Sequence, residues 1–374
     1  MSPNAVLAIN TGSSSVRLDL LDPADPSGPA RRSVRLEGAG MSDARARIGE
    51  VAAGASLVAH RVVHGGHRFT SAAVIDDAVE AGIAALVTLA PLHNEPALRW
   101  IRAARECTGP ATPHVAVFDT SFFAALPAAA STYAVDRKVA RAHGLRRMGF
   151  HGLAHQSMWR QWAASRPAMA GAGRAITFQL GAGCSAAAIA GGRPLDTSMG
   201  FTPLEGLVMA TRGGDIDPGV LLHLLREGRM DETSLDRMLS HESGLAGMAG
   251  EGDMRALLAR NDDDARAAID VYVHRARRYL GGYLAVLRGA DAVVFGGGVG
   301  EGSAHIRARI VEGMEFAGIV LDEAQNARDA GTPRRISATN SLVDIFVARV
   351  DEAAVMAEEA IAALRTFQGK DTSP

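Results

Sequence analysis

The alternation of apolar and polar residues near the N-terminus predicts a β-hairpin. Residues 6–9 form a short apolar run, and Val16, Leu18 and Leu20 alternate with polar residues farther along the chain. Alternation with a period of two is typical of strands that bury one face, and small residues between two such segments are typical of a turn. The pattern therefore predicts two strands joined by a turn of small residues at 10–15.

A second copy of this pattern lies in the middle of the chain. Residues 176–180 and 186–190 are largely apolar and flank another segment of small residues. Superposing Gly12 on Gly183 aligns the two turns. This weak repeat predicts two similar domains, each with a tight turn whose backbone amides can hold phosphate.

Longer apolar stretches around the hairpins predict helices. Residues 78–89 and 97–106 are helix-like, and residues 265–288 place apolar side chains on one stripe of an amphipathic helix. Residues 22–29 and 368–374 are polar or rich in glycine and proline, so we expect a loop and a frayed tail there. The stripe of the long helix consists of Ile269, Tyr272, Val273, Ala276, Leu280, Tyr283 and Leu287.

Two further strands end in residues suited to ligand binding. Residues 115–118 form an apolar strand that ends in Asp119, and acidic residues at strand ends are common active-site positions in α/β folds. A strand at 292–295 leads into a glycine-rich loop at 296–300. A helix beginning near Ser303 would then expose its N-terminal amides to whatever the loop binds.

Length and composition indicate a soluble α/β enzyme with about two domains. The chain has 374 residues, and domains average roughly 150 residues. A formal charge of -2 gives no concentrated positive field for nucleic acid or a membrane surface. Two cysteines, Cys107 and Cys184, and no leader before Val6 favour a reducing cytoplasm. The longest uncharged run, residues 175–192, carries four glycines, which favours strand, loop and strand over a membrane helix.

Two of the 39 basic residues are lysines, which limits how this chain can bind phosphate. Lys138 and Lys370 both lie outside any G-x-x-x-x-G-K-[ST] run, so a Walker-type nucleotide site is excluded. Lys138 lies in a charged run and Lys370 in a polar tail, which disfavours a Schiff-base lysine. Arginine, histidine, a metal ion or backbone amides must therefore contact any phosphate.

Histidine groups within residues 60–67 and 151–155 have helix-like spacing but do not predict a zinc site. Glycines interrupt both groups, and neither carries the glutamate of a zinc-hydrolase helix. Arg61 and Arg212 are more informative, because the glycines near them allow other backbone or a ligand to approach closely.

Three glycine turns together indicate a phosphate role that none of them indicates alone. Their arrangement resembles the superfamily of actin, hexokinase and heat-shock chaperones, in which two related domains clamp a nucleotide with two phosphate hairpins and an adenosine loop. The resemblance implies an α/β fold of two related actin/hexokinase-like domains with an active-site cleft between them. The expected domains are residues 1–149, completed by a C-terminal helix at about 351–366, and residues 150–350.

Eight ordered stretches carry a resemblance to one family of that superfamily. They are INTGSSS at 9–15, HRVVHGG at 60–66, APLHN at 90–94, VFDTSF at 117–122, GFHG at 149–152, DTSMGFTPLEG at 196–206, TR with IDP at 211–218, and GGVGE at 297–301. Along nearly its whole length the sequence thereby resembles the acetate kinase family, also called acetate/propionate kinases.

That family transfers the terminal phosphoryl group of ATP to acetate or propionate, reversibly, and forms an acyl phosphate and ADP. A small carboxylate titrates at roughly 4 to 5, by analogy with Asp and Glu, so at neutral pH it needs no general base. A negative oxygen must instead approach a negative phosphoryl group, so direct in-line transfer depends on alignment and charge neutralisation. The planar fork of arginine suits this task.

The resemblance implies a role for residues in each motif. Arg61 would bind the substrate and the transferring phosphoryl group, and Asp119 would organise the nucleophile and the metal environment. Arg212 and His151 would stabilise the transition state. The remaining assignments are Asn10 and Glu352 for Mg²⁺, with Mn²⁺ as an alternative; Val63, Leu92, His93, Phe150 and Pro203 for the carboxylate; and Ser13, Arg17, Gly181, Ala182, Gly183, Asp253, Met254, Arg255, Gly298, Val299, Gly300 and Gly302 for the nucleotide.

Departures from the family pattern fall mainly on the nucleotide side. Ala182 lies where the family has asparagine in the second phosphate loop, and Gln179 lies where it has histidine. Gly302 replaces an asparagine of the adenosine loop, and residues 351–353 read Asp-Glu-Ala in place of Asn-Glu-Glu. Two alternatives therefore stay open: the same carboxylate chemistry with another phosphoryl donor, and a nucleotide-binding regulatory protein without turnover. The family also implies a homodimer.

Overall fold

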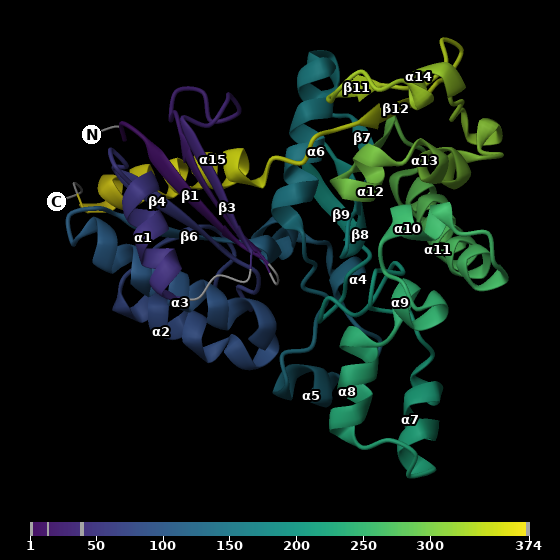
Figure 1. The fold of residues 1–374 in the computed structure, drawn as a ribbon, viewed down its shortest axis with the longest axis horizontal. Coiled ribbons are helices and arrows are strands. Elements are labelled where there is room, and N and C mark those ends of the chain that lie inside the picture. Colours follow the sequence, from purple (N-terminus) through teal and green to yellow (C-terminus); the bar gives the residue numbers. More distant parts are fainter. Residues whose placement is uncertain (1–2, 13–14, 38–40, 372–374) are drawn as a thin grey trace. The chain divides into compact units, whose positions relative to one another are not determined.

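The computed structural model describes residues 3–12, 15–37 and 41–371, which divide into two compact units (Figure 1). Compared with the domain ranges expected from the sequence, residues 126–149 belong to the second unit and residues 150–157 to the first. The first unit comprises Met1–Ala125, Phe150–Ser157 and Asp351–Pro374, and the second comprises Leu126–Gly149 and Met158–Val350.

Each unit is built on a six-stranded sheet, and the two sheets share one topology. The strand order is β3-β2-β1-β4-β6-β5 in the first and β9-β8-β7-β10-β12-β11 in the second. Corresponding neighbours pair in the same sense, antiparallel in the hairpins and parallel in the middle. This duplication confirms the two similar domains predicted from the weak repeat. The strands are β1 Val6–Thr11, β2 Ser15–Leu21, β3 Arg32–Glu37, β4 Leu57–Val62, β5 Ala73–Val74, β6 His114–Phe118, β7 Arg174–Leu180, β8 Cys184–Ala190, β9 Arg193–Thr197, β10 Ala292–Gly296, β11 Arg334–Arg335 and β12 Asp344–Val347.

The strand bounds correct the alignment of the two hairpin turns. β1 ends at Thr11 and β7 at Leu180, so the first turn residues are Gly12 and Gly181, whereas the sequence alignment paired Gly12 with Gly183. Both glycines donate their backbone N–H across their own turn. The alignment was wrong because small residues recur through both turns and fit in more than one register.

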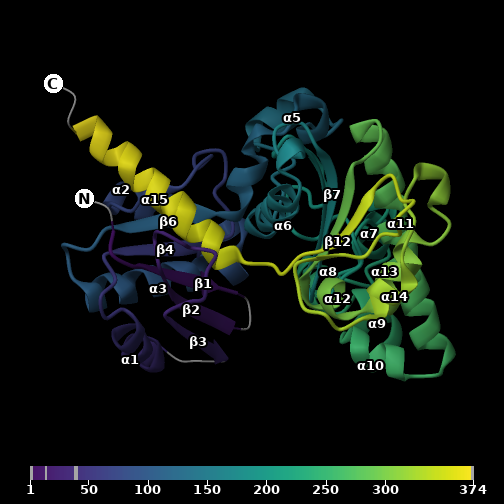
Figure 2. The ribbon, with the colours of Figure 1, turned by 90° about the horizontal axis from the view of Figure 1, so that it is seen from above.

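The first sheet is covered on both faces, and alternate residues of its strands contact different helices. The helices of this unit are α1 Met41–Val51, α2 Asp77–Ala85, α3 Pro91–Thr108 and α15 Glu352–Asp371, with 3₁₀ turns η1 Val87–Leu89 and η2 Asp119–Ala125. Val6 and Ala8 of β1 pack against α15, which crosses the strands in Figure 2. Leu7 and Ile9 pack against α1 and α3 on the opposite face. The central strands β1, β4 and β6 are buried on both sides, whereas the edge strand β3 is largely exposed.

The second sheet is covered by α11 Asp263–Leu287, and all seven residues of the predicted apolar stripe are buried there. α6 Gly152–Ser165 lies on the opposite side of this sheet from α11 (Figure 2). The other helices are α4 Ala128–Ser131, α5 Arg137–Ala142, α7 Pro218–Arg226, α8 Glu232–His241, α9 Gly244–Ala249, α10 Met254–Ala259, α12 Gly297–Gly302, α13 Ala304–Val311 and α14 Glu323–Ala327, with 3₁₀ turns η3 Pro167–Met169 and η4 Glu315–Ala317.

Two segments differ from the sequence expectation. The predicted glycine-rich loop is largely the short helix α12, although glycine is a poor helix former. The predicted tail continues α15 as far as Asp371. The helix expected near Ser303 is confirmed, because the Ser303 side chain caps α13 by accepting the Ile306 N–H. In the part of the chain that the structure describes, no helix combines the length and apolarity needed to span a membrane.

Candidate active site

Arg61 is the centre of a buried polar cluster in the first unit. Its Nε and Nη2 atoms donate to the two carboxylate oxygens of Asp119, at 3.0 and 2.7 Å. Its Nη1 atom donates to Asn10 Oδ1 at 3.0 Å and to Glu352 Oε2 at 3.1 Å. Asn10 Nδ2 donates to the same Glu352 oxygen at 2.6 Å. The structure thus brings two predicted catalytic residues and both predicted metal ligands into direct contact.

The sheet topology explains this cluster. β1, β4 and β6 are parallel neighbours, so Asn10, Arg61 and Asp119 all lie at their carboxyl ends. Asp119 is fully buried, and the Arg61 side chain is 12% exposed. Burial alone lowers the pKa of Arg61, but the charges of Asp119 and Glu352 outweigh burial and raise it. The guanidinium therefore stays charged and links the two carboxylates.

His151 lies beside this cluster in an unusual backbone conformation. Its φ is 58°, in the left-handed region that residues other than glycine rarely adopt. The following Gly152 lies against the backbone carbonyl of Asp119, where a Cβ would overlap that oxygen. Burial, with a smaller contribution from His151, lowers the pKa of the nearby His155 to about 3. The two chain segments that carry the predicted catalytic residues His151 and Asp119 therefore pack closely against each other.

The predicted carboxylate pocket is described only in part. Val63 and Phe150 are buried, and the Phe150 ring meets the ring of His64 edge-on with centroids 5.5 Å apart. His93 lies in the first turn of α3. The side chain of Leu92 lies outside the described residues.

The first hairpin carries two predicted nucleotide contacts. Ser13 lies outside the described residues. The Arg17 side chain is 51% exposed, and its Nε atom lies 2.9 Å from a carboxylate oxygen of the buried Asp19. Arg17 is thus held at the base of the turn by an ion pair with its own strand.

The turn of the second hairpin, residues 181–183, adjoins two other segments with predicted roles. The Ala182 carbonyl accepts the Ala210 N–H at 2.9 Å, which links the hairpin to the loop that leads to Arg212. A Cβ at Gly297 would lie 2.7 Å from the carbonyl at the end of β7, so α12 begins directly against that strand. These segments surround the carboxyl end of β7, a common ligand position in α/β sheets.

The remaining predicted nucleotide contacts divide between α10 and α12. Asp253 caps α10, and hydrogen bonds, first that of the Arg255 side chain, lower the pKa of its carboxyl to about 2. Arg255 is 90% exposed, whereas Met254 is buried. In α12, no described atom other than the chain neighbours and the backbone of the same helix lies within 4 Å of the point where Gly298 or Gly302 would carry a Cβ. Val299 and Gly300 lie between them in the same helix.

Arg212 and Pro203 lie together in the second unit. Arg212 Nη1 donates to the Pro203 carbonyl at 2.8 Å. Burial lowers the pKa of Arg212, and within the described second unit no carboxylate forms an ion pair with it. Arg61 is bound by two carboxylates, whereas Arg212 has a backbone carbonyl as its hydrogen-bond acceptor and no ion-pair partner among the described residues of its unit.

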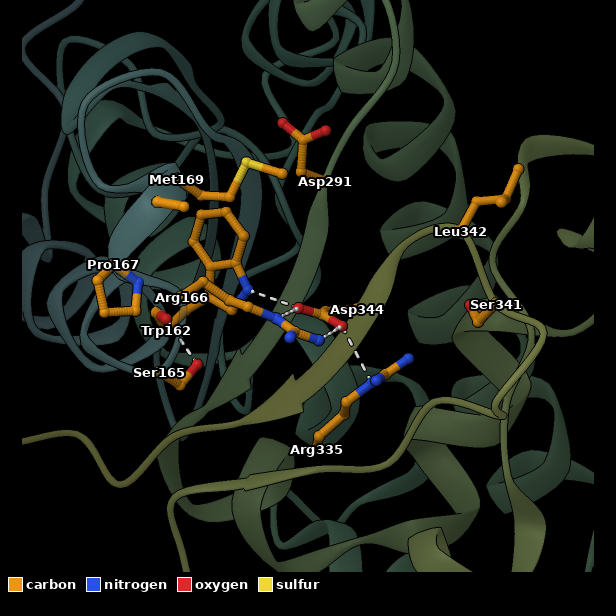
Figure 3. Close-up of a pocket in the computed structure, with 11 residues that line it drawn as sticks. Trp162, Ser165, Arg166, Pro167, Met169, Asp291, Arg335, Ser341, Leu342 and Asp344 are labelled. Atoms are coloured by element: carbon orange, nitrogen blue, oxygen red, sulfur yellow. Dashed lines mark hydrogen bonds and ion pairs between the residues drawn. The ribbon is translucent and has the colours of Figure 1, made fainter.

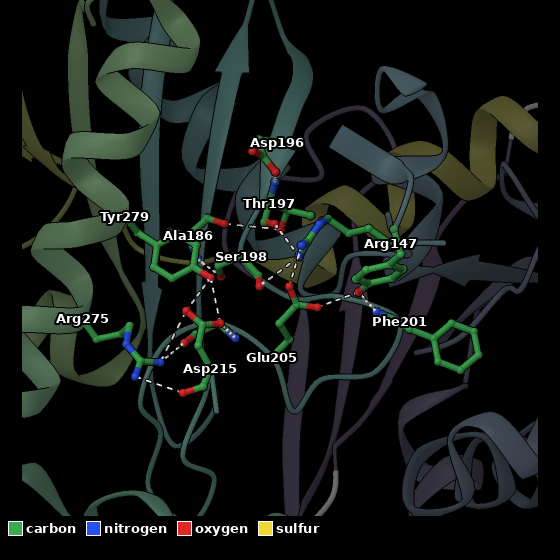
Figure 4. A network of polar contacts seen from close by, with 12 residues as sticks. Arg147, Ala186, Asp196, Thr197, Ser198, Phe201, Glu205, Asp215, Arg275 and Tyr279 are labelled. Carbon is green, nitrogen blue, oxygen red and sulfur yellow. Dashed lines mark hydrogen bonds and ion pairs between the residues drawn. The ribbon is translucent and has the colours of Figure 1, made fainter. Parts of the chain in front are cut away.

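Sequence reasoning missed a polar network in the second unit (Figure 4). Arg147 Nη2 donates to Glu205 Oε1 at 2.5 Å, and the Tyr133 hydroxyl donates to Glu205 Oε2 at 2.6 Å. Glu205 lies in the 196–206 stretch that resembles the acetate kinase family, but the resemblance implied no role for it. Tyr133 and Arg147 lie outside the recognised motifs, so only the folded structure identifies them as partners of Glu205.

Comparison with known proteins establishes the family. The model of the acetokinase family matches residues 41–358. A curated acetate kinase from Streptomyces avermitilis is 41% identical over 98% of this chain and 99% of its own length. The chain belongs to the acetokinase family. The solved Porphyromonas gingivalis acetate kinase has a TM-score of 0.88 at 32% identity, covering 96% of this chain and 100% of that one. A Francisella tularensis propionate kinase has a TM-score of 0.86 at 32% identity, covering 96% and 99%.

Acetokinase membership confirms the expected fold class and makes the chain an enzyme. With Ala182, the turn of the second hairpin reads Gly-Ala-Gly at 181–183 and carries no polar side chain. Gln179, three residues earlier, has a buried Oε1 atom without a hydrogen-bond partner among the described residues. Its Nε2 atom lies 3.0 Å from the point where a Cβ of Gly297 would be. The Gln179 amide thus lies near the end of β7, against the start of α12.

A cavity of about 500 Å³ in the second unit of this acetokinase is lined by none of the predicted site residues (Figure 3). Its charged walls are already paired: Arg166 donates twice to Asp344, at 2.8 and 2.9 Å, and Arg335 lies 3.0 Å from the same carboxylate. Trp162 Nε1 also donates to Asp344. These contacts join α6 to β12, which is a structural role.

Proposed function

We propose that this acetokinase transfers the γ-phosphoryl group of ATP to acetate or propionate and so forms the acyl phosphate and ADP. The observation that carries the proposal is the cluster of Arg61 with Asn10, Asp119 and Glu352 in a chain of this family. The cluster provides a guanidinium, oriented by Asp119, and oxygen ligands at the carboxyl ends of three parallel strands.

The chemistry proposed for this chain depends on charge rather than on proton transfer. The carboxylate substrate is ionised at neutral pH, so the protein must offset the repulsion between it and the phosphoryl group. We assign that task to Arg61, Arg212 and His151, with Asp119 holding the Arg61 fork in one orientation through two hydrogen bonds. Arginine donates to two oxygens of a phosphoryl group at once, which favours a planar transition state.

The residues of the Arg61 cluster also fit Mg²⁺. Mg²⁺ prefers oxygen ligands and is usually held by one or two carboxylates together with substrate phosphates. Glu352 and the Asn10 amide supply such oxygens, and their side chains are already in contact. When bound, Mg²⁺ neutralises phosphate charge and orients the phosphates. Asn10 and Glu352 are the ligands we propose, with Asp119 orienting them through Arg61.

Replacing Glu352 by glutamine is expected to raise the Mg²⁺ concentration for half-maximal rate by about tenfold, because one charged oxygen becomes a neutral amide. The measurement is a Mg²⁺ titration of the initial rate at saturating ATP and acetate. Glu37→Gln is the matched control, since the Glu37 side chain is 73% exposed and pairs with the exposed Arg35. An unchanged Mg²⁺ requirement in Glu352→Gln would remove Glu352 from the metal site.

The proposed activity is tested directly by trapping acyl phosphate as its hydroxamate. Purified protein, ATP, Mg²⁺ and acetate or propionate are expected to yield the hydroxamate, and EDTA is expected to abolish it. No product with any C2 to C4 acid would sink the proposal. A panel of ATP, other nucleoside triphosphates and pyrophosphate at fixed acetate identifies the phosphoryl donor.

We propose a homodimer that contacts through α7. The helix is largely apolar, yet none of its described residues is buried. Leu222 and Leu225 lie three residues apart on one face of the helix and are 47% and 40% exposed, and exposed apolar side chains on one face commonly mark an interface. Leu222→Glu is expected to convert a dimer into a monomer in sedimentation experiments. Leu342→Glu, at an 87% exposed position elsewhere in the unit, should stay dimeric, and a monomeric wild type would contradict the proposal.

We also propose a cytoplasmic location. Cys107 and Cys184 are both free thiols, which suits a reducing compartment. Cell fractionation with an antibody to this chain tests the location, and recovery with the periplasmic or extracellular fraction would contradict it.

A further inference from the structure

Loop 198–206 is held at both flanks of Pro203 by one hydroxyl group. The Tyr133 hydroxyl accepts the Phe201 N–H at 2.8 Å and donates to Glu205 Oε2 at 2.6 Å. Phe201 and Glu205 lie two residues before and two residues after Pro203. A single side chain outside the loop therefore fixes both arms of the turn that carries Pro203.

Close packing leaves this hydroxyl little freedom. A Cβ at Gly200 would overlap both the Glu205 carboxylate and the Tyr133 hydroxyl, so a side chain there would displace them from their present positions. Burial, reinforced by Glu205, raises the pKa of Tyr133, which keeps the hydroxyl protonated and able to donate. Arg147 completes the contact by donating to the other Glu205 oxygen at 2.5 Å. It also donates to the carbonyls of Thr197 and Ser198, at 3.2 and 3.3 Å, at the start of the loop.

The far end of the same segment is anchored independently. Asp215 accepts the Gly206 N–H at 2.9 Å and the Tyr279 hydroxyl at 3.1 Å. Arg275 donates to the carbonyls of Gly206 and Asp215 (Figure 4). Between the two anchors, the Arg212 guanidinium is attached to the loop by its hydrogen bond to the Pro203 carbonyl.

We propose that Tyr133 and Glu205 are positioning residues that orient the Arg212 guanidinium through the Pro203 carbonyl. The inference rests on the proposed function, in which Arg212 stabilises charge on the transferring phosphoryl group. Arg212 lacks an ion-pair partner in its own unit, so the Pro203 carbonyl is the acceptor that fixes its direction. A displacement of about 1 Å in such a group is enough to lower turnover by roughly a hundredfold.

Tyr133→Phe is expected to lower kcat at least tenfold while the KM values for ATP and acetate change less than about threefold. We expect kcat to change more than the KM values because the orientation of Arg212 matters most when charge develops in the transition state. Tyr283→Phe is the matched control: it deletes a buried hydroxyl of the same unit that has no hydrogen-bond partner among the described residues. The melting temperatures of both variants are measured alongside.

Two comparisons separate positioning from a general loss of structure. Glu205→Gln keeps an oxygen that can accept from Tyr133, so it should retain more kcat than Glu205→Ala. In an Arg212→Lys background the effect of Tyr133→Phe on kcat should shrink below about threefold, because the two changes act on one group.

The kcat values distinguish a failure of the positioning inference from a failure of the proposed function. An equal fall in kcat in the wild-type and Arg212→Lys backgrounds would mean that Tyr133 acts elsewhere and would overturn the inference. Unchanged kcat in Tyr133→Phe, with an active wild type, would also overturn it and leave the proposed function intact. A wild-type chain that forms no acyl hydroxamate would overturn the proposed function itself.

Discussion

Arg212→Ala is expected to lower kcat for acyl phosphate formation by about 10³-fold while the protein stays folded. The guanidinium is partly buried, and the described second unit offers it no carboxylate partner. Its charge therefore contributes little to stability and is available to an anionic group. Steady-state hydroxamate assays and thermal melting measure the two effects separately.

Two control variants sharpen this test. Arg212→Lys keeps the charge without the planar fork and should recover only part of the lost rate. Arg237→Ala removes an arginine of the same unit that is 64% exposed and paired with an exposed Glu242, and it should match the wild type. An Arg212→Ala enzyme with kcat within threefold of the wild type would exclude Arg212 from transition-state stabilisation.

Arg61→Gln is expected to abolish measurable turnover and also to destabilise the first unit by about 3–5 kcal/mol. The Asp119 and Glu352 side chains are 1% and 15% exposed and share this guanidinium as their counter-charge. Removing it leaves two carboxylates close together with little solvent. The loss of stability distinguishes Arg61 from Arg212 and is measured by chemical denaturation.

A double variant tests the cause of that destabilisation. Arg61→Gln/Asp119→Asn removes one of the stranded charges, so it should regain part of the lost stability without regaining activity. Arg35→Gln, in an exposed ion pair of the same unit, should cost less than about 1 kcal/mol. An Arg61→Gln protein as stable as the wild type would show that the carboxylates do not need this partner.

The elements with strong periodicity could be predicted from the sequence. The stripe of α11 and the alternation of Val16, Leu18 and Leu20 in β2 identify apolar side chains that are buried, because helices and strands repeat with different periods. The two similar domains were predicted from a repeat that is only weakly visible in the sequence, yet the two sheets share the same order of six strands. The turn register failed at Gly12 and Gly183, where small residues satisfy several alignments.

The residues of the candidate site could be predicted from the sequence, but the contacts between them could not. The motifs named Asn10, Arg61, Asp119 and Glu352, yet their pairing depends on parallel strands and on a helix that begins 291 residues after Arg61. Tyr133 could not be found from sequence, because nothing near it in the chain marks a contact with Glu205. Long-range hydrogen bonds of this kind require the fold.

The position of α15 has a consequence for the order of folding. Its 20 residues, 352–371, cover one face of a sheet whose first strand begins at Val6, so the first unit is completed by a helix that follows the whole second unit in the chain. Until it leaves the ribosome, Val6, Ala8 and the neighbouring apolar positions have no cover. This apolar face of the first sheet therefore stays exposed until the second unit has been synthesised, and exposed apolar surface of this kind makes an incomplete chain prone to aggregation.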